Sequence, residues 1–427
     1  MKRIAEFLLL AALVGFLLIK GILPAWNEVH SDFVNYYVSA KLVTDGQPLD
    51  SLYDNAWFQK KIIENGIDTP GKFAPFPPIT AWMMTPFTFF SPLAAQRIFT
   101  LINLLFLVGC IWLIQKITEW KMTYCAIFIL GGGLSIVNNI AFGQVYGIMT
   151  FFILLSIFLL QKNPVLAGMS LGVFSALKYF PIVFSIGYFL NGLNNNRVSA
   201  TENRHSIISS ADSKLAFSSL LTLVVLIILQ FLFFGTTVMN EFLTAVFIPH
   251  LDGHLTGQGL YSFQFQSWDN FFRNLFIANA EFNPSPFVDW PNGKTICKII
   301  VVTSLTGLTA FTLYGCKDLE SSLRRSVFLA LLSLTALVIL PASATYHFVL
   351  LVIPLTLLLR ERILDHQAEI ILLVAYGLIG FIPYGLAFRL AASFGLFFAY
   401  PRLWLISVMY FTVVVSLLNR TVSFSQR

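Results

Sequence analysis

Long apolar segments recur from one end of this 427-residue chain to the other, and they restrict its possible folds more than any other feature. An α-helix needs about 20 apolar residues to cross the ~30 Å hydrocarbon layer of a membrane. Only 11% of the residues are charged, whereas a soluble domain has roughly 25%. The runs fall near residues 1–24, 93–116, 122–141, 144–161, 164–178, 180–192, 214–236, 295–316, 324–341, 345–360, 368–388 and 401–419. The pattern predicts an all-α, polytopic membrane protein that forms a single domain over residues 1–427, with about twelve transmembrane helices.

Two details of these runs bear on the topology. The first run begins MKR, continues to Leu23 and is followed by no small-x-small cleavage site, so we expect it to be retained as a membrane span. The runs 164–178 and 180–192 are short and are interrupted at Lys178 and Pro181, which fits either one bent helix or a hairpin. The hairpin puts both chain termini on the same side of the membrane.

The distribution of charge assigns that side. With alternating loops, 15 of the 27 basic residues and nine of the 21 acidic ones fall on the side of the termini, which leaves that side at +6 and the other side near zero. Short basic loops are typical of the cytoplasmic face. We therefore predict cytoplasmic N- and C-termini in a plasma (inner) membrane. The net charge of +6 is thus explained by topology, and no nucleic-acid partner is expected.

Two extracytoplasmic segments are large under this topology, residues 25–92 and residues 237–294. The first contains two short amphipathic stretches that are expected to lie on the membrane as interfacial helices. Its last part, residues 72–92, is apolar but is interrupted by five prolines, so we expect an interfacial or re-entrant element rather than a span. The longest inner loop, residues 191–213, reads as a polar linker.

The first large segment carries several acidic residues directly after the first span. A carboxylate at this boundary can meet a substrate that is lipid at one end and polar at the other. Three of these acids, Asp45, Asp50 and Asp54, lie close to Gly46, Pro48 and Asn55 and suit turns and helix caps. Asp32 belongs to the same segment, and we single it out as a residue that could carry chemistry.

Four further polar residues are expected near the same membrane face, and each has a plainer explanation. Lys178 could bind a lipid phosphate or could extend its ammonium to the interface. His347 could be a ligand or a hydrogen-bonded structural histidine. Arg273 could pair with Asp269, one helical turn before it. Gln144 could cap a helix. Together with Asp32 these groups suit an anionic lipid donor and a hydroxyl acceptor.

Other chemistries find little support in the sequence. The four cysteines form no CxxC or Cys/His group, so neither a disulfide framework nor a zinc site is indicated. Walker, Rossmann, HExxH and GxSxG motifs are absent. We expect no metal and no cofactor. The apolar runs show no obvious internal repeat, which disfavours a symmetric transporter.

Several segments resemble a known family. They are SDFVNYYVSAKLVTDGQPLDSLYD, FPPITAWMMTPF, FGQVYGIMTFFILLSIFLL and PVLAGMSLGVFSALKYFPI, followed more loosely by TGQGLYSFQFQSWDNFFRNLF and YHFVLLVIPLTLL. In this order they resemble the blocks of glycosyltransferase family 87 over residues 30–360. The chain departs from that pattern within 257–267, where Gly257, Gln258 and Gly259 replace the family's Asn-Gln-Ser.

The resemblance implies a GT-C-type membrane enzyme that uses a polyprenyl-phosphate sugar, typically mannose, and a lipid or glycan acceptor. It implies an inverting hexosyl transfer with Asp32 as base. Lys178, Arg273 and His347 are the expected ligands of the donor phosphate. The expected substrate-binding residues are Tyr36, Tyr37, Pro77, Pro78 and Gln144.

Two alternatives remain open from the sequence. A flippase or transporter for a lipid-linked sugar would carry polar residues at mid-span on several helices. A polymerase or ligase of lipid-linked glycans would use residues 237–294 as its acceptor site.

Overall fold

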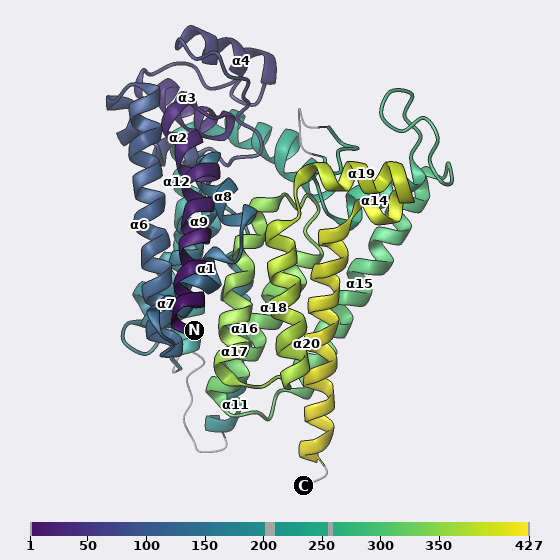
Figure 1. Cartoon of the computed structure of the whole chain (residues 1–427). Helices are drawn as coiled ribbons and strands as arrows, with labels where there is room; N and C mark the ends of the chain where they lie inside the picture. The colour runs from purple at the N-terminus through teal and green to yellow at the C-terminus, as the bar shows by residue number, and fades with distance from the viewer. Residues whose placement is uncertain (1, 201–209, 255–258, 426–427) are drawn as a thin grey trace.

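The computed structural model describes residues 2–200, 210–254 and 259–425 (Figure 1). Every named element within these ranges is a helix, and the only β contact there is an isolated bridge between Asn279 and Asn283. The expected all-α fold is therefore confirmed for the part of the chain that is described. Residues 201–209 of the expected inner linker, and Gly257 and Gln258 within the second large segment, lie outside it.

The first helix of the bundle runs without a break from α1 (Lys2–Leu17) through the π-helical turn η1 (Leu18–Ile22) to α2 (Leu23–Asn27). It ends at Glu28, whose backbone is extended (φ −134°, ψ 150°). The chain then turns into α3 (Ser31–Thr44), so Asp32 lies in the first turn of a new helix. This break brings a carboxylate to the point where the first segment meets the next.

The rest of the first large segment packs onto α3. It contains α4 (Asn55–Glu64), which Asp54 caps by accepting hydrogen bonds from the backbone N–H groups of Ala56 and Trp57. It then forms two short pieces, α5 (Ile79–Met83) and the 3₁₀ turn η2 (Thr85–Phe89). As its prolines predict, residues 72–92 build no helix long enough to cross a membrane.

The bundle itself comprises the longer helices. They are α6 (Pro92–Thr118), α7 (Met122–Leu130), α8 (Leu134–Ala141), α9 (Tyr146–Leu159), α10 (Pro164–Leu177), α11 (Ile182–Ala200), α12 (Ala211–Glu241), α15 (Pro291–Gly315), α16 (Ser321–Val338), α17 (Val352–Glu361), α18 (His366–Phe381) and α20 (Pro401–Ser425). Shorter elements join them: η3 (Phe242–Phe247), α13 (Ile248–Leu251), α14 (Trp268–Phe276), η4 (Thr345–Leu351), α19 (Tyr384–Phe394) and η5 (Leu396–Ala399). Residues 164–192 thus form two helices, α10 and α11, and not one bent helix.

The structure does not confirm twelve crossings. Within the described residues, six helical segments are long and apolar enough to span a membrane, or up to eight if each of two bent helix pairs is one span. Two expected spans become α9 and α10, which have 14 residues each and are shorter than the ~20 that a span needs. A third bends by 78° between α7 and α8, where Gly133 adopts a φ of +52°. An apolar run in a sequence does not distinguish a membrane span from a short helix that is buried among others.

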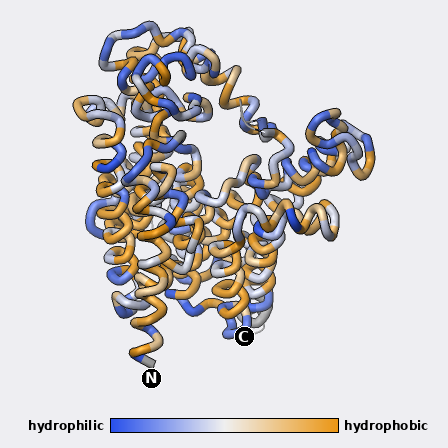
Figure 2. The backbone as a smooth tube through the Cα atoms, turned by 45° about the horizontal axis from the view of Figure 1, so that its top comes forward, coloured by the Kyte–Doolittle hydropathy of each residue, from blue (hydrophilic) through white to orange (hydrophobic). Residues whose placement is uncertain are grey.

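The outer surface of the bundle is apolar. Large hydrophobic side chains on α1, α6, α12, α15 and α20 are highly exposed, and examples are Phe7 (69%), Leu105 (69%), Leu232 (74%), Ile299 (58%) and Val415 (54%). Figure 2 shows hydrophobic residues along the bundle, with hydrophilic ones gathered in the segments at its ends. Such an exposed apolar surface is expected where a protein contacts lipid, and the chain is a membrane protein.

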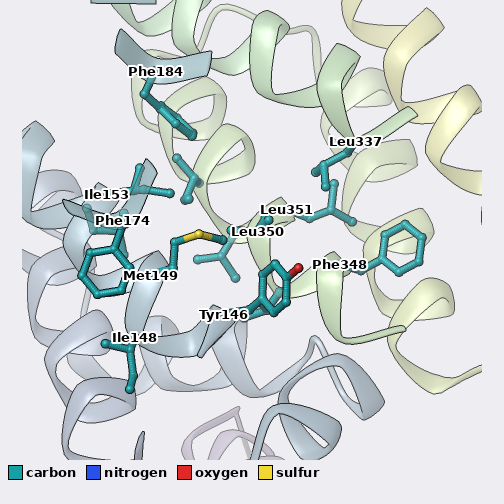
Figure 3. Close-up of a cluster of buried hydrophobic side chains, with 14 of the residues drawn as sticks. Tyr146, Ile148, Met149, Ile153, Phe174, Phe184, Leu337, Phe348, Leu350 and Leu351 are labelled. Atoms are coloured by element: carbon teal, nitrogen blue, oxygen red, sulfur yellow. The ribbon is translucent and has the colours of Figure 1, made fainter. Parts of the chain in front are cut away.

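The interior is equally apolar and closely packed. Figure 3 shows one region of it, where α9, α10 and η4 meet through Tyr146, Met149, Phe174 and Leu350. The contact between α10 and α12 is especially close, because a Cβ atom at Gly168 or Gly172 would collide with the backbone or side chains of α12. This packing fixes α10, whose C-terminal end carries Lys178.

Both chain termini lie toward the lower end of the bundle in Figure 1, whereas α3, α4, α14 and α19 lie at its upper end. At the upper end a second, smaller core forms around Phe271, Phe272 and Tyr400. The predicted site residues Asp32 and Arg273 belong to α3 and α14 at this upper end.

Candidate active site

Asp32 and Lys178 line the same cavity, which we call the central cavity and which has a volume of about 370 Å³. Its walls come from the start of α3, residues 72–76, the start of α9, residues 178–183, the end of α13 and residues 336–350. Its polar or ionisable lining residues are Asp32, Asn35, Lys72, Gln144, Tyr146, Lys178, Tyr179, His250, Tyr346 and His347. Segments that are far apart in the sequence therefore converge on one site.

The Asp32 carboxylate is held by Gln144, whose side chain hydrogen-bonds to it. The side-chain oxygen of Gln144 accepts a hydrogen bond from the Tyr36 hydroxyl, at 3.4 Å, which leaves the amide N–H group to donate to Asp32. Gln144 is 1% exposed. It makes no capping bond to α9, so the helix-cap interpretation of this residue does not apply.

Lys178 follows the last residue of α10 with an extended backbone (φ −147°, ψ 127°). Its ammonium lies over the ring of Phe76, with Nζ 4.3 Å from the centroid, and 5.2 Å from that of Tyr146. Burial lowers the pKa of Lys178 to about 8, and the negative charge of Asp32 opposes that shift. The side chain thus lies inside the protein, and it does not extend to the surface as a snorkelling lysine would.

His347 is held from both sides of its ring. The backbone N–H of Ala344 donates to Nδ1 at 2.8 Å, and Nε2 lies 2.8 Å from the Tyr146 hydroxyl. An Nδ1 atom that accepts a hydrogen bond carries no proton, so this geometry suits the neutral ring with its proton on Nε2. His347 therefore lines the cavity as a neutral group that orients Tyr146.

Lys72 is a cavity residue that the sequence analysis missed. Its backbone N–H donates to the Asn35 side chain at 2.7 Å, which ties this loop to α3 one turn after Asp32. Its ammonium nitrogen is buried and has no hydrogen-bond partner among the described residues. Burial lowers the pKa of Lys72 to about 8, again opposed by Asp32. The only signal in the sequence is a single basic residue at the start of a proline-rich apolar stretch.

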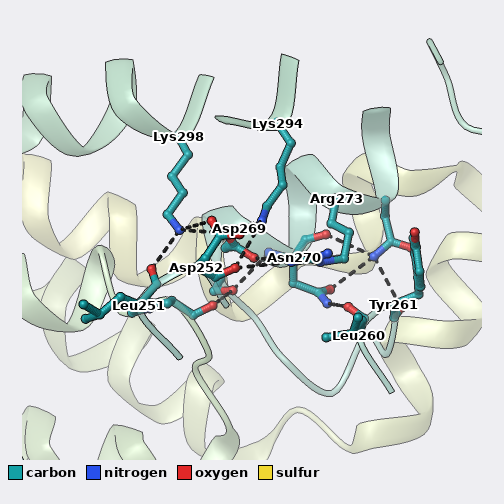
Figure 4. Close-up of polar contacts among 12 residues, drawn as sticks. Leu251, Asp252, Leu260, Tyr261, Asp269, Asn270, Arg273, Lys294 and Lys298 are labelled. Atoms are coloured by element: carbon teal, nitrogen blue, oxygen red, sulfur yellow. Dashed lines mark hydrogen bonds and ion pairs between the residues drawn. The ribbon is translucent and has the colours of Figure 1, made fainter. Parts of the chain in front are cut away.

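Arg273 does not belong to this group. It lies on α14, where its guanidinium pairs with Asp269 at 3.3 Å, as Figure 4 shows. Lys294 and Lys298 of α15 also pair with Asp269, at 3.2 and 2.9 Å. Arg273 is not among the residues that line the central cavity, so its predicted contact with a donor phosphate has no geometric basis here.

The remaining predicted substrate-binding residues are not among those that line the central cavity. The Tyr36 ring packs on Phe76, with centroids 4.6 Å apart. The Tyr37 hydroxyl donates to the Phe90 carbonyl at 2.8 Å. Pro77 and Pro78 are buried next to Phe76, while Pro75 and Phe76 themselves line the cavity. Tyr36 is connected to Asp32 through Gln144.

Two further hollows adjoin the central cavity. One, which we call the apolar groove, has a volume of about 510 Å³ and shares Lys178 with it. Its other lining residues come mainly from the segments 80–106, 145–152 and 166–177 and are almost all apolar. The second, which we call the polar cavity, measures about 270 Å³ and shares Asp32, Phe265 and Tyr346. Asp32 and Lys178 therefore stand at two different exits of the central cavity.

Within the described residues, no group of three or more His, Cys, Asp or Glu side chains is arranged to hold a metal ion. The charged groups of the central cavity are one carboxylate and two ammonium groups.

The protein is a helical membrane domain in which a charged cavity adjoins an apolar groove. This combination suits an amphipathic ligand. The family model described as Glycosyltransferase family 87 matches residues 73–343, more than half of the chain, and the chain belongs to that family. The family indicates a membrane glycosyltransferase, and the predicted resemblance is confirmed. No curated protein and no solved structure matches the chain. Asp32 and Lys72 precede the matched segment, so their roles depend on the geometry of the cavity.

Proposed function

We propose that the chain transfers a sugar from a polyprenyl-phosphate donor to a hydroxyl group, with inversion at the anomeric carbon and with Asp32 as the base. Mannose is the sugar that the family resemblance favours. The proposal includes a GT-C-type arrangement in which the segment after the first span carries the base.

The charge of the central cavity is the observation that carries this proposal. A pKa of about 8 leaves both Lys72 and Lys178 largely protonated at neutral pH. Together with an ionised Asp32 they give the cavity one excess positive charge. A buried charge without a partner is costly, so the site is suited to a ligand with a single negative charge. A polyprenyl-phosphate sugar is a phosphodiester with that charge.

The charges of the cavity and of the bound lipid also balance after the reaction. Transfer moves one proton from the acceptor to Asp32, and the polyprenyl phosphate leaves with a second negative charge. The two ammonium groups then face a neutral carboxylic acid and a dianion. A diphosphate-linked donor would add one more negative charge at both stages, which this set of residues does not balance.

The apolar groove suits the polyprenyl chain. It ends at Lys178, where the chain would meet the phosphate, and the sugar would then lie in the central cavity next to Asp32. Lys178 would contact the leaving phosphate oxygen, whose charge grows as the bond to the anomeric carbon breaks.

The chemical step is a direct displacement. Asp32 takes the proton of the acceptor hydroxyl while the acceptor oxygen bonds to the anomeric carbon and the bond from that carbon to the phosphate oxygen breaks. A base positioned in this way contributes roughly 10²- to 10⁴-fold to the rate. His347, as a neutral ring, would hold the Tyr146 hydroxyl in place beside the sugar.

The positive-inside distribution of charge supports an extracytoplasmic site with cytoplasmic termini in a plasma membrane. The helix α3, which carries Asp32, lies at the end of the bundle opposite the termini (Figure 1), which is compatible with that orientation.

The test is transfer by the full chain in nanodiscs, with radiolabelled polyprenyl-phosphate mannose and with total membrane lipids or methyl glycosides as acceptors. Asp32→Asn should lower turnover by about 10²-fold or more while the donor still binds. Asp45→Asn is the matched control, because Asp45 is exposed at the far end of the same helix and pairs only with Lys41 in an i,i+4 bridge. Near-normal turnover of Asp32→Asn would refute the base, and donor lipid that is moved across the bilayer but not cleaved would favour the flippase.

A further inference from the structure

The polar cavity differs chemically from the central one. It is lined by Asp32, Phe142, Gly259, Ser262, Gln264, Phe265, Ala344, Tyr346 and Tyr384. Apart from Asp32, none of these residues carries a charge. It meets the central cavity at Asp32, Phe265 and Tyr346, so a molecule in it could reach the base from the side away from the apolar groove.

The walls of the polar cavity are firmly held. Residues 259–265 form a compact turn in which the Ser262 carbonyl accepts the N–H of Phe265 at 3.1 Å. Gln266 anchors this turn, since its backbone N–H donates to Ser343 at 2.9 Å and its side chain donates to the Ala399 carbonyl at 2.9 Å. A site built from fixed segments can select a ligand by its chemistry.

Tyr384 lines the cavity as a hydrogen-bonded neutral group. Its hydroxyl oxygen accepts a hydrogen bond from the Asn138 side chain at 2.7 Å, and the hydroxyl also hydrogen-bonds with the Thr345 side chain. Gln264 is exposed and adds an amide that can both donate and accept. These neutral groups, with the rings of Tyr346 and Phe265, suit the hydroxyl groups and the apolar faces of a sugar.

One cation, Arg402, lies close to this cavity, but its hydrogen bonds go to backbone carbonyl groups. The Arg402 guanidinium lies over the Tyr384 ring at 5.6 Å and donates to the carbonyls of Ile379 and Ile382. Arg402 is 2% exposed and is not among the residues that line the polar cavity. An anionic ligand would thus bring its charge next to ionised Asp32 with no described cation in contact to balance it.

We infer that the polar cavity binds the acceptor and selects a neutral sugar over an acidic one. This inference rests on the proposed transfer reaction, for which it names the class of acceptor. Two like charges that are close together at a partly buried site repel each other. The preference for a neutral acceptor over an otherwise identical anion should accordingly be about tenfold or more.

The experiment compares a methyl hexuronoside with its methyl ester, which differ by one negative charge. Binding to the full chain is measured by saturation-transfer NMR in nanodiscs free of glycoside detergent that contain polyprenyl phosphate, so that the cationic central cavity is already occupied by an anion and no turnover is required. The ester should bind at least about tenfold more tightly than the free acid. Equal binding, tighter binding of the acid, or binding of neither compound would overturn the inference.

Two variants at one exposed position test the cause. Gln264→Lys should raise the affinity for the acid several-fold relative to the ester, and Gln264→Glu should lower it further. If neither variant changes the ratio, the selectivity does not arise in the polar cavity and the inference fails. A transfer assay on the same samples separates the two proposals. If the chain shows charge selectivity but no sugar transfer, the binding site is supported and the proposed reaction is rejected. If the chain transfers sugar and favours the acid, the proposed reaction is supported and the inference about the polar cavity is rejected.

Discussion

The side chain of Gln144 hydrogen-bonds to the Asp32 carboxylate and also accepts a hydrogen bond from Tyr36 on the helix that carries that carboxylate. The start of α9 is thereby joined to the first turn of α3. This contact orients the one acidic group of the central cavity, so it is the feature on which a base at this position most depends.

Gln144→Leu should therefore lower turnover more than donor affinity. The substitution keeps the side-chain size but removes the N–H group that holds Asp32 in place, and we expect kcat to fall about 10- to 100-fold, since a lost hydrogen bond to a charged group is worth about 1.5–3 kcal/mol. The measurement is steady-state transfer with kcat and KM resolved for the donor. Gln47→Leu, at an exposed position after α3, is the control. A variant whose donor KM alone rises would place Gln144 in donor binding instead.

The pH dependence of kcat/KM should have an alkaline limb near pH 8. Burial lowers the pKa values of both Lys72 and Lys178 to about 8, so each ammonium group is present below that pH and is lost as the pH rises through it. An anionic donor should consequently bind less well above pH 8. The profile is measured between pH 6 and 10, in the free-enzyme parameter kcat/KM.

Lys72→Arg and Lys72→Met separate the two lysines. Arginine stays charged through this range, so Lys72→Arg should leave an alkaline limb due to Lys178 alone. Lys72→Met removes one of the two positive charges and should raise the donor KM by about tenfold or more. If Lys72→Met binds the donor as the wild type does, Lys72 plays no part in holding the phosphate.

Part of this site could be predicted from residue type, local context and the family resemblance. Asp32 was singled out because it matches the base position of the family that the sequence resembles, and Lys178 because it interrupts an apolar run; both line one cavity. Lys72 was missed because its importance comes from Asn35, which fixes its loop against α3, and no local pattern encodes such a contact. Arg273 lies outside the central cavity and belongs to an ion cluster that Lys294 and Lys298, from a helix further along the chain, complete around Asp269.

The expected twelve membrane spans are not confirmed, for a related reason. Apolar composition is shared by helices that face lipid and by short helices that are enclosed by others. The helices α9 and α10 are of the second kind on their cavity side, where Tyr146, Phe174 and Leu177 are buried. The length of a helix distinguishes a membrane span from a short enclosed helix, and the sequence sets only an upper limit on that length.

Asp269→Asn should destabilise the upper end of the bundle. Asp269 is 3% exposed and pairs with three cations from α14 and α15, so its loss leaves buried positive charge with only Asp252 nearby (Figure 4). Removal of one partner from a buried ion cluster costs about 3–5 kcal/mol. Thermal unfolding in detergent, compared with Asp45→Asn as an exposed pair worth about 1 kcal/mol or less, gives the difference. Equal unfolding temperatures for the two variants would show that the cluster adds nothing to stability.

Gly168→Ala should affect both stability and transfer, although Gly168 lies outside the cavity. A Cβ atom at this position would collide with the Leu215 carbonyl and the Ser218 hydroxyl of α12. The clash must push α10 away from α12, at a cost of about 1–3 kcal/mol, and this moves Lys178 at the end of α10 relative to Asp32. Gly307→Ala on α15 is the matched control, because nothing lies within 4 Å of its new methyl group and alanine is favoured over glycine in a helix by about 1 kcal/mol. We expect the first variant to unfold earlier and to lose donor affinity several-fold, and the second to unfold no earlier than the wild type. If Gly168→Ala unfolds earlier but binds the donor normally, the α10–α12 contact supports the fold without setting the position of Lys178.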